Sequence, residues 1–218
     1  MKLDFEEVGV TSLAKSYGPT LALAGVDLSF SAGSVTVIQG ANGSGKSTLL
    51  WLLALLAHPT KGDIRFGKYG VGHADELRGS IGFIAHQLQL YPGLSGRENL
   101  ILAAKLQGIP YANKRAEDLG QALGTEEYWD RPLRTYSRGQ AQRISIARAL
   151  LHEPRLLLMD EPATGLDVKS TESFVGLIEQ EKRRGAIVII VTHESKFAGA
   201  VADRVLHMER GRMVEPVV

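Results

Sequence analysis

The feature that most constrains this chain is a glycine-rich turn between an apolar segment and a helix-forming segment. The turn, GANGSGKS, runs from Gly40 to Ser47; the apolar segment Val35 to Gln39 precedes it and the apolar run Leu49 to Ala57 follows it. This spacing in a strand-turn-helix setting predicts a phosphate-binding loop, in which backbone N–H groups and the positive end of the helix face phosphate oxygens. A glycine-rich turn with only a structural role is the alternative, and the setting disfavours it.

The residues of this loop divide the expected contacts between them. Lys46 is expected to reach the outer phosphates of a nucleotide, and Ser47 is expected to hold a magnesium ion. The glycines let consecutive backbone N–H groups converge on the phosphates. The nominated nucleotide-binding residues of the loop are Gly40, Asn42, Gly43, Ser44, Gly45, Lys46, Ser47 and Thr48.

A second candidate element is a pair of adjacent carboxylates, Asp160 and Glu161, at the end of the apolar segment Leu156 to Asp160. Ligands of open α/β sheets collect at the carboxyl ends of the strands. We expect Asp160 to act on magnesium and Glu161 to polarise a water molecule. Alone, such a pair is as often a helix cap or a solvated turn, but beside a phosphate-binding loop the catalytic interpretation is favoured.

Apolar segments of strand length alternate with helical segments along much of the chain. Nearly continuous apolar runs are typical of strands covered on both faces, so we predict an α/β fold with a parallel sheet core. Together with the phosphate-binding loop, this core resembles that of a P-loop NTPase (RecA-like). The predicted core strands are Val35 to Gln39, Ile81 to Ala85, Leu156 to Asp160 and Ile187 to Thr192. Three earlier segments alternate in polarity and contain glycine, which predicts an N-terminal antiparallel β-lobe. They lie around Phe5 to Lys15, Val26 to Ser31 and Asp63 to Phe66.

The domain organisation follows from where the strand patterns stop. Helical patterns replace them over residues 92–151, which predicts an inserted helical subdomain. Residues 1–91 and 152–218 are expected to form the core and the β-lobe. No repeat, low-complexity tract or long linker divides the chain, so we expect a single domain over residues 1–218.

Two helix starts within the helical region fit capping boxes. Ser95 is followed three residues later by Glu98, and Ser137 is followed in the same way by Gln140. The second start precedes a segment with apolar residues along one helical face. A helix that begins at Ser137 offers a second turn with the geometry of an anion-binding site.

Composition excludes several classes of function. The chain has 25 basic and 24 acidic residues, a net charge of +1, so no overall field favours nucleic acid, and no nucleic-acid partner is predicted. It has no cysteine, which excludes disulfides and thiol chemistry. The acidic N-terminal segment does not resemble an export signal. The apolar run Leu49 to Ala57 is too short to cross a bilayer, which takes about 20 residues.

The stretch YSRGQAQRISIARALLHEPRLLLMDEPATGLD, residues 136–167, resembles the most diagnostic block of the ABC (ATP-binding cassette) ATPases, from the signature motif to the catalytic carboxylates. The resemblance extends from AKSYGPTLALAGVDLSF, residues 14–30, to ADRVLHMERGRMVE, residues 202–215, with the family motifs in the expected order. It implies ATP and Mg²⁺ as cofactors. It also implies an ATPase that hydrolyses the γ-phosphate with an aligned water molecule.

The resemblance assigns roles to four further residues. Tyr17 matches the aromatic residue that stacks on adenine, and Gln87 matches the glutamine that senses magnesium and the attacking water. Asp167 matches the aspartate through which two catalytic sites communicate, and His193 matches the switch histidine that contacts the γ-phosphate. Outside this motif order, such residues are more often packing or turn residues. The expected catalytic residues are therefore Glu161, His193 and Gln87, and the expected metal ligands are Ser47, Gln87 and Asp160.

The signature motif, usually Leu-Ser-Gly-Gly-Gln in this family, is matched by Ser137, Gly139 and Gln140 and departs from the family pattern at two positions. Tyr136 replaces the leucine and Arg138 replaces a glycine. Three interpretations of the arginine stay open: it strengthens contact with the nucleotide, it binds a partner, or it lies in solvent.

The resemblance implies two kinds of protein partner. ATP is expected to lie between the phosphate loop of one subunit and the signature of another, so the chain should form a homodimer or a heterodimer with a sister cassette. The implied function is that of the ATP-hydrolysing subunit of an ABC transporter. It would sit peripherally at the cytoplasmic face of the cell membrane and power a separate transmembrane permease subunit.

Several hypotheses on the finer function stay open. The short chain and the segment GFIAHQLQLYPGLSGRENL are similar to the haem exporter ATPases of cytochrome c biogenesis. An exporter of another small molecule or drug is an alternative, and so is a soluble non-transport ABC ATPase that acts on ribosomes or DNA. Those soluble proteins usually carry two cassettes or long insertions. A P-loop kinase is disfavoured by the signature and by His193.

Overall fold

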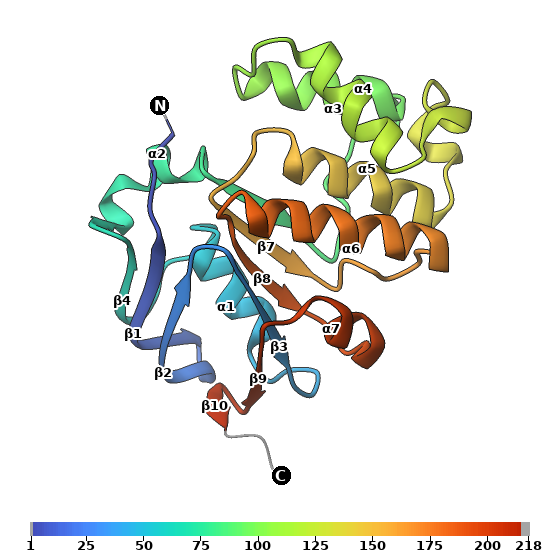
Figure 1. Ribbon diagram of the computed structural model, residues 1–218. Helices are drawn as coiled ribbons and strands as arrows, with labels where there is room; N and C mark the ends of the chain where they lie inside the picture. The colour runs from blue at the N-terminus through green and yellow to red at the C-terminus, as the bar shows by residue number, and fades with distance from the viewer. Residues whose placement is uncertain (1, 215–218) are drawn as a thin grey trace.

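The computed structural model describes residues 2–214 and contains two sheets with helices around them (Figure 1). The larger sheet has the strand order β10-β9-β3-β8-β7-β6, and the smaller one the order β2-β1-β4-β5. The strands of the larger sheet are β3 (Ser34–Gln39), β6 (Ile81–Ile84), β7 (Leu156–Asp160), β8 (Ile187–Val191), β9 (Arg204–Glu209) and β10 (Arg212–Val214). Those of the smaller sheet are β1 (Glu7–Tyr17), β2 (Thr20–Ser31), β4 (Lys61–Phe66) and β5 (Tyr69–Gly70).

The larger sheet is the predicted parallel core. Strands β6, β7, β8, β3 and β9 pair in parallel, and only β10 runs antiparallel to its neighbour. Both β7 and β8 are buried at every position, because helices or the other sheet cover both of their faces. The carboxyl ends of these strands therefore meet at one edge of the sheet, where a ligand can approach.

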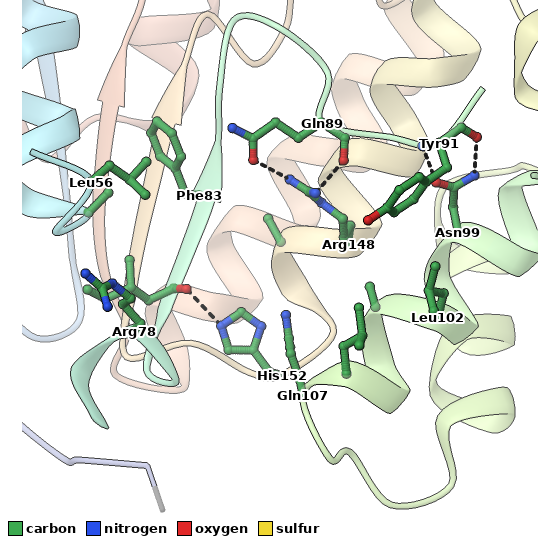
Figure 2. A pocket seen from close by; sticks show the side chains of 15 residues that line it. Leu56, Arg78, Phe83, Gln89, Tyr91, Asn99, Leu102, Gln107, Arg148 and His152 are labelled. Atoms are coloured by element: carbon green, nitrogen blue, oxygen red, sulfur yellow. Dashed lines mark hydrogen bonds between the residues drawn. The ribbon is translucent and has the colours of Figure 1, made fainter. Parts of the chain in front are cut away.

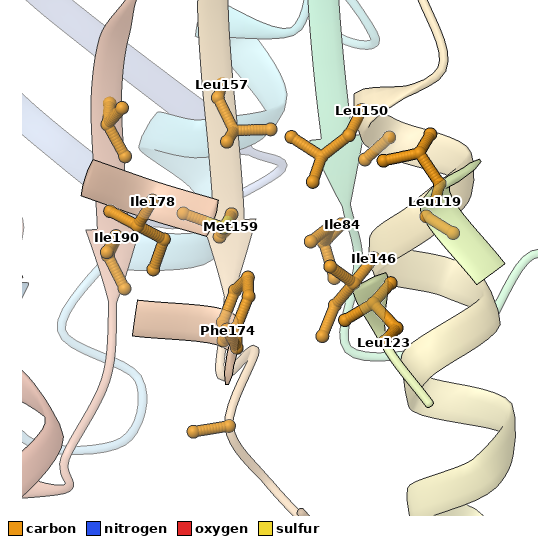
Figure 3. Packing of buried hydrophobic residues seen from close by; sticks show 14 of the residues in the cluster. Ile84, Leu119, Leu123, Ile146, Leu150, Leu157, Met159, Phe174, Ile178 and Ile190 are labelled. Atoms are coloured by element: carbon orange, nitrogen blue, oxygen red, sulfur yellow. The ribbon is translucent and has the colours of Figure 1, made fainter. Parts of the chain in front are cut away.

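The two faces of the sheet pack against different partners. Leu157 and Met159 of β7 point into a cluster with α5, α6 and α7, which includes Phe174 and Ile178 of α6 (Figure 3). Leu156 and Leu158 point the other way, into a cluster with α1 and the β-lobe. Successive residues of a strand face opposite sides, so an apolar run such as LLLM serves both clusters. The helices around the sheet are α1 (Lys46–Leu53), α2 (Ala74–Arg78), α6 (Val168–Arg183) and α7 (Ser195–Val201).

The smaller sheet is the predicted antiparallel β-lobe. β1 pairs antiparallel with both β2 and β4, and its register shifts after Val10 and again near Ala14. Its inner face contributes Val8, Leu13 and Phe66 to the cluster around α1. The β-lobe thereby covers the helix that begins at the phosphate loop.

Three α-helices and two short 3₁₀ turns occupy the region predicted to be helical. They are α3 (Gly96–Leu106), α4 (Ala112–Ala122) and α5 (Arg138–Leu150), with 3₁₀ turns at Glu126–Tyr128 and Leu133–Thr135; a further 3₁₀ turn, Val71–His73, precedes α2. Both predicted capping boxes are confirmed, at Ser95 before α3 and at Ser137 before α5. The predicted fold class, a parallel sheet core with an antiparallel β-lobe and inserted helices, is confirmed.

The sequence analysis missed the last two strands of the sheet. β9 joins the edge of β3 through the parallel pairs Thr36 with Arg204 and Gln39 with His207. Its burial is mixed rather than continuous, so it lacks the apolar run that marked the other core strands. No helix within residues 2–214 is long and apolar enough to cross a membrane.

Candidate functional site

A cleft of about 430 Å³ lies where the phosphate loop meets the ends of β7 and β8. It brings together predicted site residues that are more than 140 positions apart in the sequence. The cleft is lined by Thr20, Leu21, Ala22, Asn42, Gly43, Gly45, Lys46, Ser47, Thr48, His86, Asp160, Glu161, Val191 and His193.

The phosphate loop presents an open helix end to this cleft. Gly45 precedes α1 with a left-handed backbone (φ 108°), and no side chain caps the helix. The Lys46 ammonium group donates to the carbonyl oxygens of Gly40 and Ala41, both at 2.8 Å, and to the Ser44 hydroxyl at 3.3 Å. The lysine is therefore held over the loop by weak acceptors that phosphate oxygens can replace.

Asp160 and Ser47 form the part of the cleft that fits a magnesium ion. Asp160 is only 6% exposed. Burial raises the pKa of its carboxyl, and the Ser47 hydroxyl opposes this shift by hydrogen bonding. Within residues 2–214 no cluster of three or more histidines or carboxylates could hold a metal. One carboxylate and one hydroxyl suit Mg²⁺, which usually completes its shell with water and the substrate phosphates.

Glu161 is held beside His193 at the edge of the cleft. Its carboxylate accepts hydrogen bonds from the Thr192 hydroxyl (3.1 Å) and the His193 backbone N–H (3.4 Å), and it lies 2.8 Å from His193 Nδ1. The hydrogen bond with Glu161 raises the pKa of His193. Glu161 has a left-handed backbone (φ 51°), which turns the chain sharply after β7.

The signature residues lie outside this cleft. Ser137 caps α5 by accepting the Gln140 backbone N–H, and the Gln140 side chain accepts the Ser137 N–H at 3.0 Å. A Cβ atom added at Gly139 would lie 2.2 Å from the Gly165 carbonyl oxygen, so only glycine fits there without a shift. Arg138 is exposed.

Asp167 also lies outside the cleft and caps a helix. Its carboxylate accepts the Ser170 backbone N–H at 2.8 Å at the start of α6, and this hydrogen bond lowers its pKa. Arg143 of α5 donates to the same carboxylate at 3.4 Å. The contact connects the signature helix to the segment that carries Asp167, and the sequence analysis did not nominate Arg143.

The structure places Tyr17 and Gln87 beside the cleft rather than in its lining. Tyr17 is 45% exposed, and the Lys15 ammonium lies 4.9 Å from the centre of its ring. Gln87 is exposed, whereas its neighbour His86 lines the cleft. Sequence reasoning missed His86 and the segment from Thr20 to Ala22; their only signal was proximity to the nominated residues.

A second cleft, of about 340 Å³, separates the sheet core from α3 and α5 (Figure 2). Leu56, Phe83, Leu102 and Leu106 give it apolar walls. Arg148 of α5 crosses it and donates to the Gln89 carbonyl oxygen at 2.5 Å. This bond holds the segment that follows β6 against the signature helix.

Comparison with known proteins places this geometry in a family. A sequence model described as ABC transporter matches residues 23–164. The sn-glycerol-3-phosphate import ATP-binding protein of Agrobacterium fabrum is 36% identical over 95% of the chain and 56% of its own length. The arginine transport ATP-binding protein of Haemophilus influenzae is 36% identical over 95% of the chain and 90% of its own length.

Solved structures give the same result. A dimeric ATP-binding cassette in a post-hydrolysis state with ADP and Pi is 28% identical, covers 95% of this chain and 97% of its own, and has a TM-score of 0.86. The chain spans only 52–64% of several curated relatives. The family match covers the phosphate loop, the signature and the Asp160–Glu161 pair. The chain therefore belongs to the ABC transporter family and is an ATP-binding domain of that family.

Proposed function

We propose that this chain is the ATP-binding and ATP-hydrolysing subunit of an ABC transporter and powers transport through a separate membrane subunit. The observation that carries the proposal is the cleft in which Lys46, Ser47, Asp160, Glu161 and His193 meet. An open helix N-terminus and an ammonium group bind phosphates, and the two carboxylates lie beside the place where the terminal phosphate would bind.

Hydrolysis follows from the positions of the side chains. The triphosphate would replace the Gly40 and Ala41 carbonyl oxygens as the acceptors of Lys46, which already lies over the loop. Ser47 and Asp160 would hold Mg²⁺, which neutralises developing charge on the phosphates. Glu161 aligns and polarises the attacking water, and His193 keeps the Glu161 carboxylate oriented and reaches the γ-phosphate.

The separation of the signature from the cleft supports a composite site between two chains. Ser137, Gly139 and Gln140 are absent from the lining of the cleft, so in a head-to-tail dimer they would face the nucleotide of the other subunit. Dimeric cassettes among the similar solved structures support this arrangement. In the same dimer, Asp167 would contact the opposite site.

Two nominated residues keep proposed roles at the edge of the cleft. The Tyr17 ring has Lys15 on one side, and adenine would stack on the ring. Gln87 would enter the site when nucleotide and magnesium draw in the segment after β6. Both roles depend on the bound nucleotide.

The second cleft is the proposed docking place of the membrane subunit. It lies between the core and the predicted helical subdomain, residues 92–151, so a bound segment would move when the two rotate relative to each other. The chain would then act peripherally at the cytoplasmic face of the membrane. The exposed apolar side chains of Leu56, Tyr91 and Leu106 at this cleft support docking of a protein segment.

The proposed cargo is haem. This proposal comes from the segment that places His86 before Gln87, which is similar to the haem exporter ATPases. Similar proteins are named for several other functions, among them methionine import, daunorubicin/doxorubicin resistance and macrolide export. The membrane subunit would select among such cargoes.

Replacement of Glu161 by glutamine tests the function. Amide and carboxylate have the same shape, but the amide cannot polarise water, so turnover should fall by about 100-fold or more while ATP still binds. ATP with Mg²⁺ should then trap a dimer in size-exclusion chromatography. Glu172→Gln, the same change on the exposed surface of α6, is the matched control. Turnover that persists in Glu161→Gln, together with a monomer in ATP, would contradict the proposal.

A further inference from the structure

Tyr136, the residue that departs from the usual leucine of the signature, lies between the starts of two helices. Its ring packs edge to face against Tyr128, with ring centres 4.9 Å apart and planes at 85°. It also packs against the main core cluster. Leucine could supply such apolar packing, so packing alone does not explain a tyrosine.

The hydroxyl group of Tyr136 makes contacts that leucine cannot make. It accepts the backbone N–H of Gly96 at 3.1 Å and lies 2.6 Å from the Tyr128 carbonyl oxygen, to which it donates. Gly96 is the first residue of α3, so this N–H has no acceptor within its own helix. The hydroxyl of this signature residue therefore supplies the acceptor that the first N–H of α3 lacks.

The fit between Tyr136 and Gly96 is close. A Cβ atom at position 96 would lie 2.6 Å from the Tyr136 hydroxyl oxygen and 2.9 Å from Ile144 Cδ1. Any larger residue at position 96 would displace the hydroxyl. The missing side chain at position 96 and the tyrosine at position 136 thus form a matched pair.

The bond connects two capped helix starts. Ser95 caps α3 and is followed by Gly96, and Ser137 caps α5 and directly follows Tyr136. The far part of α3, with Leu102 and Leu106, forms a wall of the second cleft (Figure 2). A displacement of α3 at that wall would reach the Ser137 turn through the Tyr136 hydrogen bond, in addition to the packing of α3 against α5.

We propose that Tyr136 is a positioning residue whose hydroxyl fixes the Ser137 turn relative to α3, and that this bond sets the geometry with which the signature closes on the nucleotide of a second subunit. The proposal rests on the proposed function for its second part only. The first part, the bond between the two helix starts, can be tested in the free chain.

Two tyrosine-to-phenylalanine changes form the test. Tyr136→Phe keeps the ring and removes a hydroxyl with three partners: the Gly96 N–H, the Tyr128 carbonyl oxygen and, at 3.4 Å, the Trp129 carbonyl oxygen. Tyr128→Phe is the matched control, because within residues 2–214 the buried Tyr128 hydroxyl has no hydrogen-bond partner. Hydrogen exchange in the free chain should become about fivefold faster for the Gly96 amide in Tyr136→Phe, the value for a net hydrogen bond of about 1 kcal/mol, and should stay unchanged in Tyr128→Phe.

Closure of the signature on a second subunit is measured as ATP-driven dimerisation of chains that also carry Glu161→Gln. ATP-driven dimerisation should weaken about fivefold in Tyr136→Phe, with ATP binding by the monomer unchanged. A merely structural role would lower thermal stability without a selective loss of dimerisation. Equal behaviour of the two phenylalanine variants in exchange and dimerisation would overturn the proposal. If Glu161→Gln itself stays monomeric, the composite site fails, and the Gly96 amide still decides whether the bond exists.

Discussion

Helices α1 and α5, which begin at the two predicted phosphate-binding turns, start in opposite ways. Gly45 precedes α1 with a left-handed backbone and no side-chain cap. Ser137 precedes α5, accepts the Gln140 backbone N–H and has its own N–H accepted by the Gln140 side chain. The start of α1 is therefore open to a ligand in a single chain, whereas α5 satisfies part of its own start. Two turns that look alike in sequence can therefore differ in structure: the start of α1 has no side-chain cap, whereas side chains of its own already occupy the start of α5.

The largest expected effect comes from mixing two variants, one defective in the phosphate loop and the other at the start of α5. The mixture tests whether the start of α5 completes the nucleotide site of a partner subunit. Ser137→Arg should bind ATP through its intact phosphate loop but abolish hydrolysis, because a bulky cation replaces the cap at the subunit interface. Lys46→Ala should also lose hydrolysis, because its phosphate loop lacks the cation although its signature is intact. In an equimolar mixture of the two variants, about half of the dimers should contain one chain of each kind, and each such dimer has one intact site out of two. For a symmetric dimer the mixture should therefore regain about a quarter of wild-type ATPase activity.

Two results of the mixing experiment would go against the expected recovery of activity. Ser137→Arg chains that hydrolyse ATP normally as monomers would show that α5 does not serve a partner. A mixture with no activity, although cross-linking shows mixed dimers, would show that one intact site cannot act without the other. ATPase assays at several mixing ratios measure both outcomes.

Lys46→Ala alone tests whether the start of α1 is sufficient without its cation. ATP affinity should fall about 100-fold, because charge-assisted hydrogen bonds contribute about 1.5–3 kcal/mol each. Lys169→Ala, an exposed lysine on α6, is the control. Titration with a fluorescent nucleotide measures both variants, and unchanged affinity in Lys46→Ala would show that the backbone amides alone hold the phosphates.

The far end of α5 predicts a pH effect on stability. His152 follows α5, donates its Nε2–H to the Ile81 carbonyl oxygen at 3.0 Å, and is 6% exposed. Burial, with Lys2 and Arg184 nearby, lowers its pKa to about 4. The unfolded chain therefore binds a proton that the folded chain resists. The contribution of His152 to the free energy of unfolding should be fully present above about pH 6.5 and should fall by about 3 kcal/mol as the pH drops to 4.

Replacement of the histidine isolates this effect. His152→Gln keeps a donor for the Ile81 carbonyl oxygen and removes the titrating group, so urea unfolding should lose its extra acid sensitivity. Both proteins share all other acid-labile groups, and the difference between their unfolding free energies isolates His152. Parallel pH profiles for the two proteins would show that the buried imidazole does not govern the end of the signature helix.

The smallest expected effect is the loss of the α5 cap itself. Ser137→Ala should reduce the free energy of unfolding by about 1 kcal/mol, and Ser137→Thr by less, because threonine still offers a hydroxyl. Hydrogen exchange of the Gln140 amide checks that the loss lies at the start of α5. An unchanged rate at that amide would mean that α5 is as open as α1, and the comparison would lose its basis.

Much of the fold could be predicted because its signals are local. The apolar runs that form β7 and β8 need covering on both faces, and the capping boxes at Ser95 and Ser137 fix two helix starts through bonds between near neighbours. β9 could not be predicted. Its residues are only partly buried, and it becomes a strand because the edge of β3 offers it hydrogen-bond partners more than 160 residues earlier in the chain.

The candidate site divides in the same way. The phosphate loop and the Asp160–Glu161 pair could be predicted from sequence because each depends on residues adjacent in the chain, and the family motifs could be predicted from their order along it. Tertiary packing was needed to show that His86 rather than Gln87 lines the cleft and that Tyr136 joins α3 to the signature. Such contacts depend on how separate elements pack, and the sequence pattern of one element carries no record of the other's position.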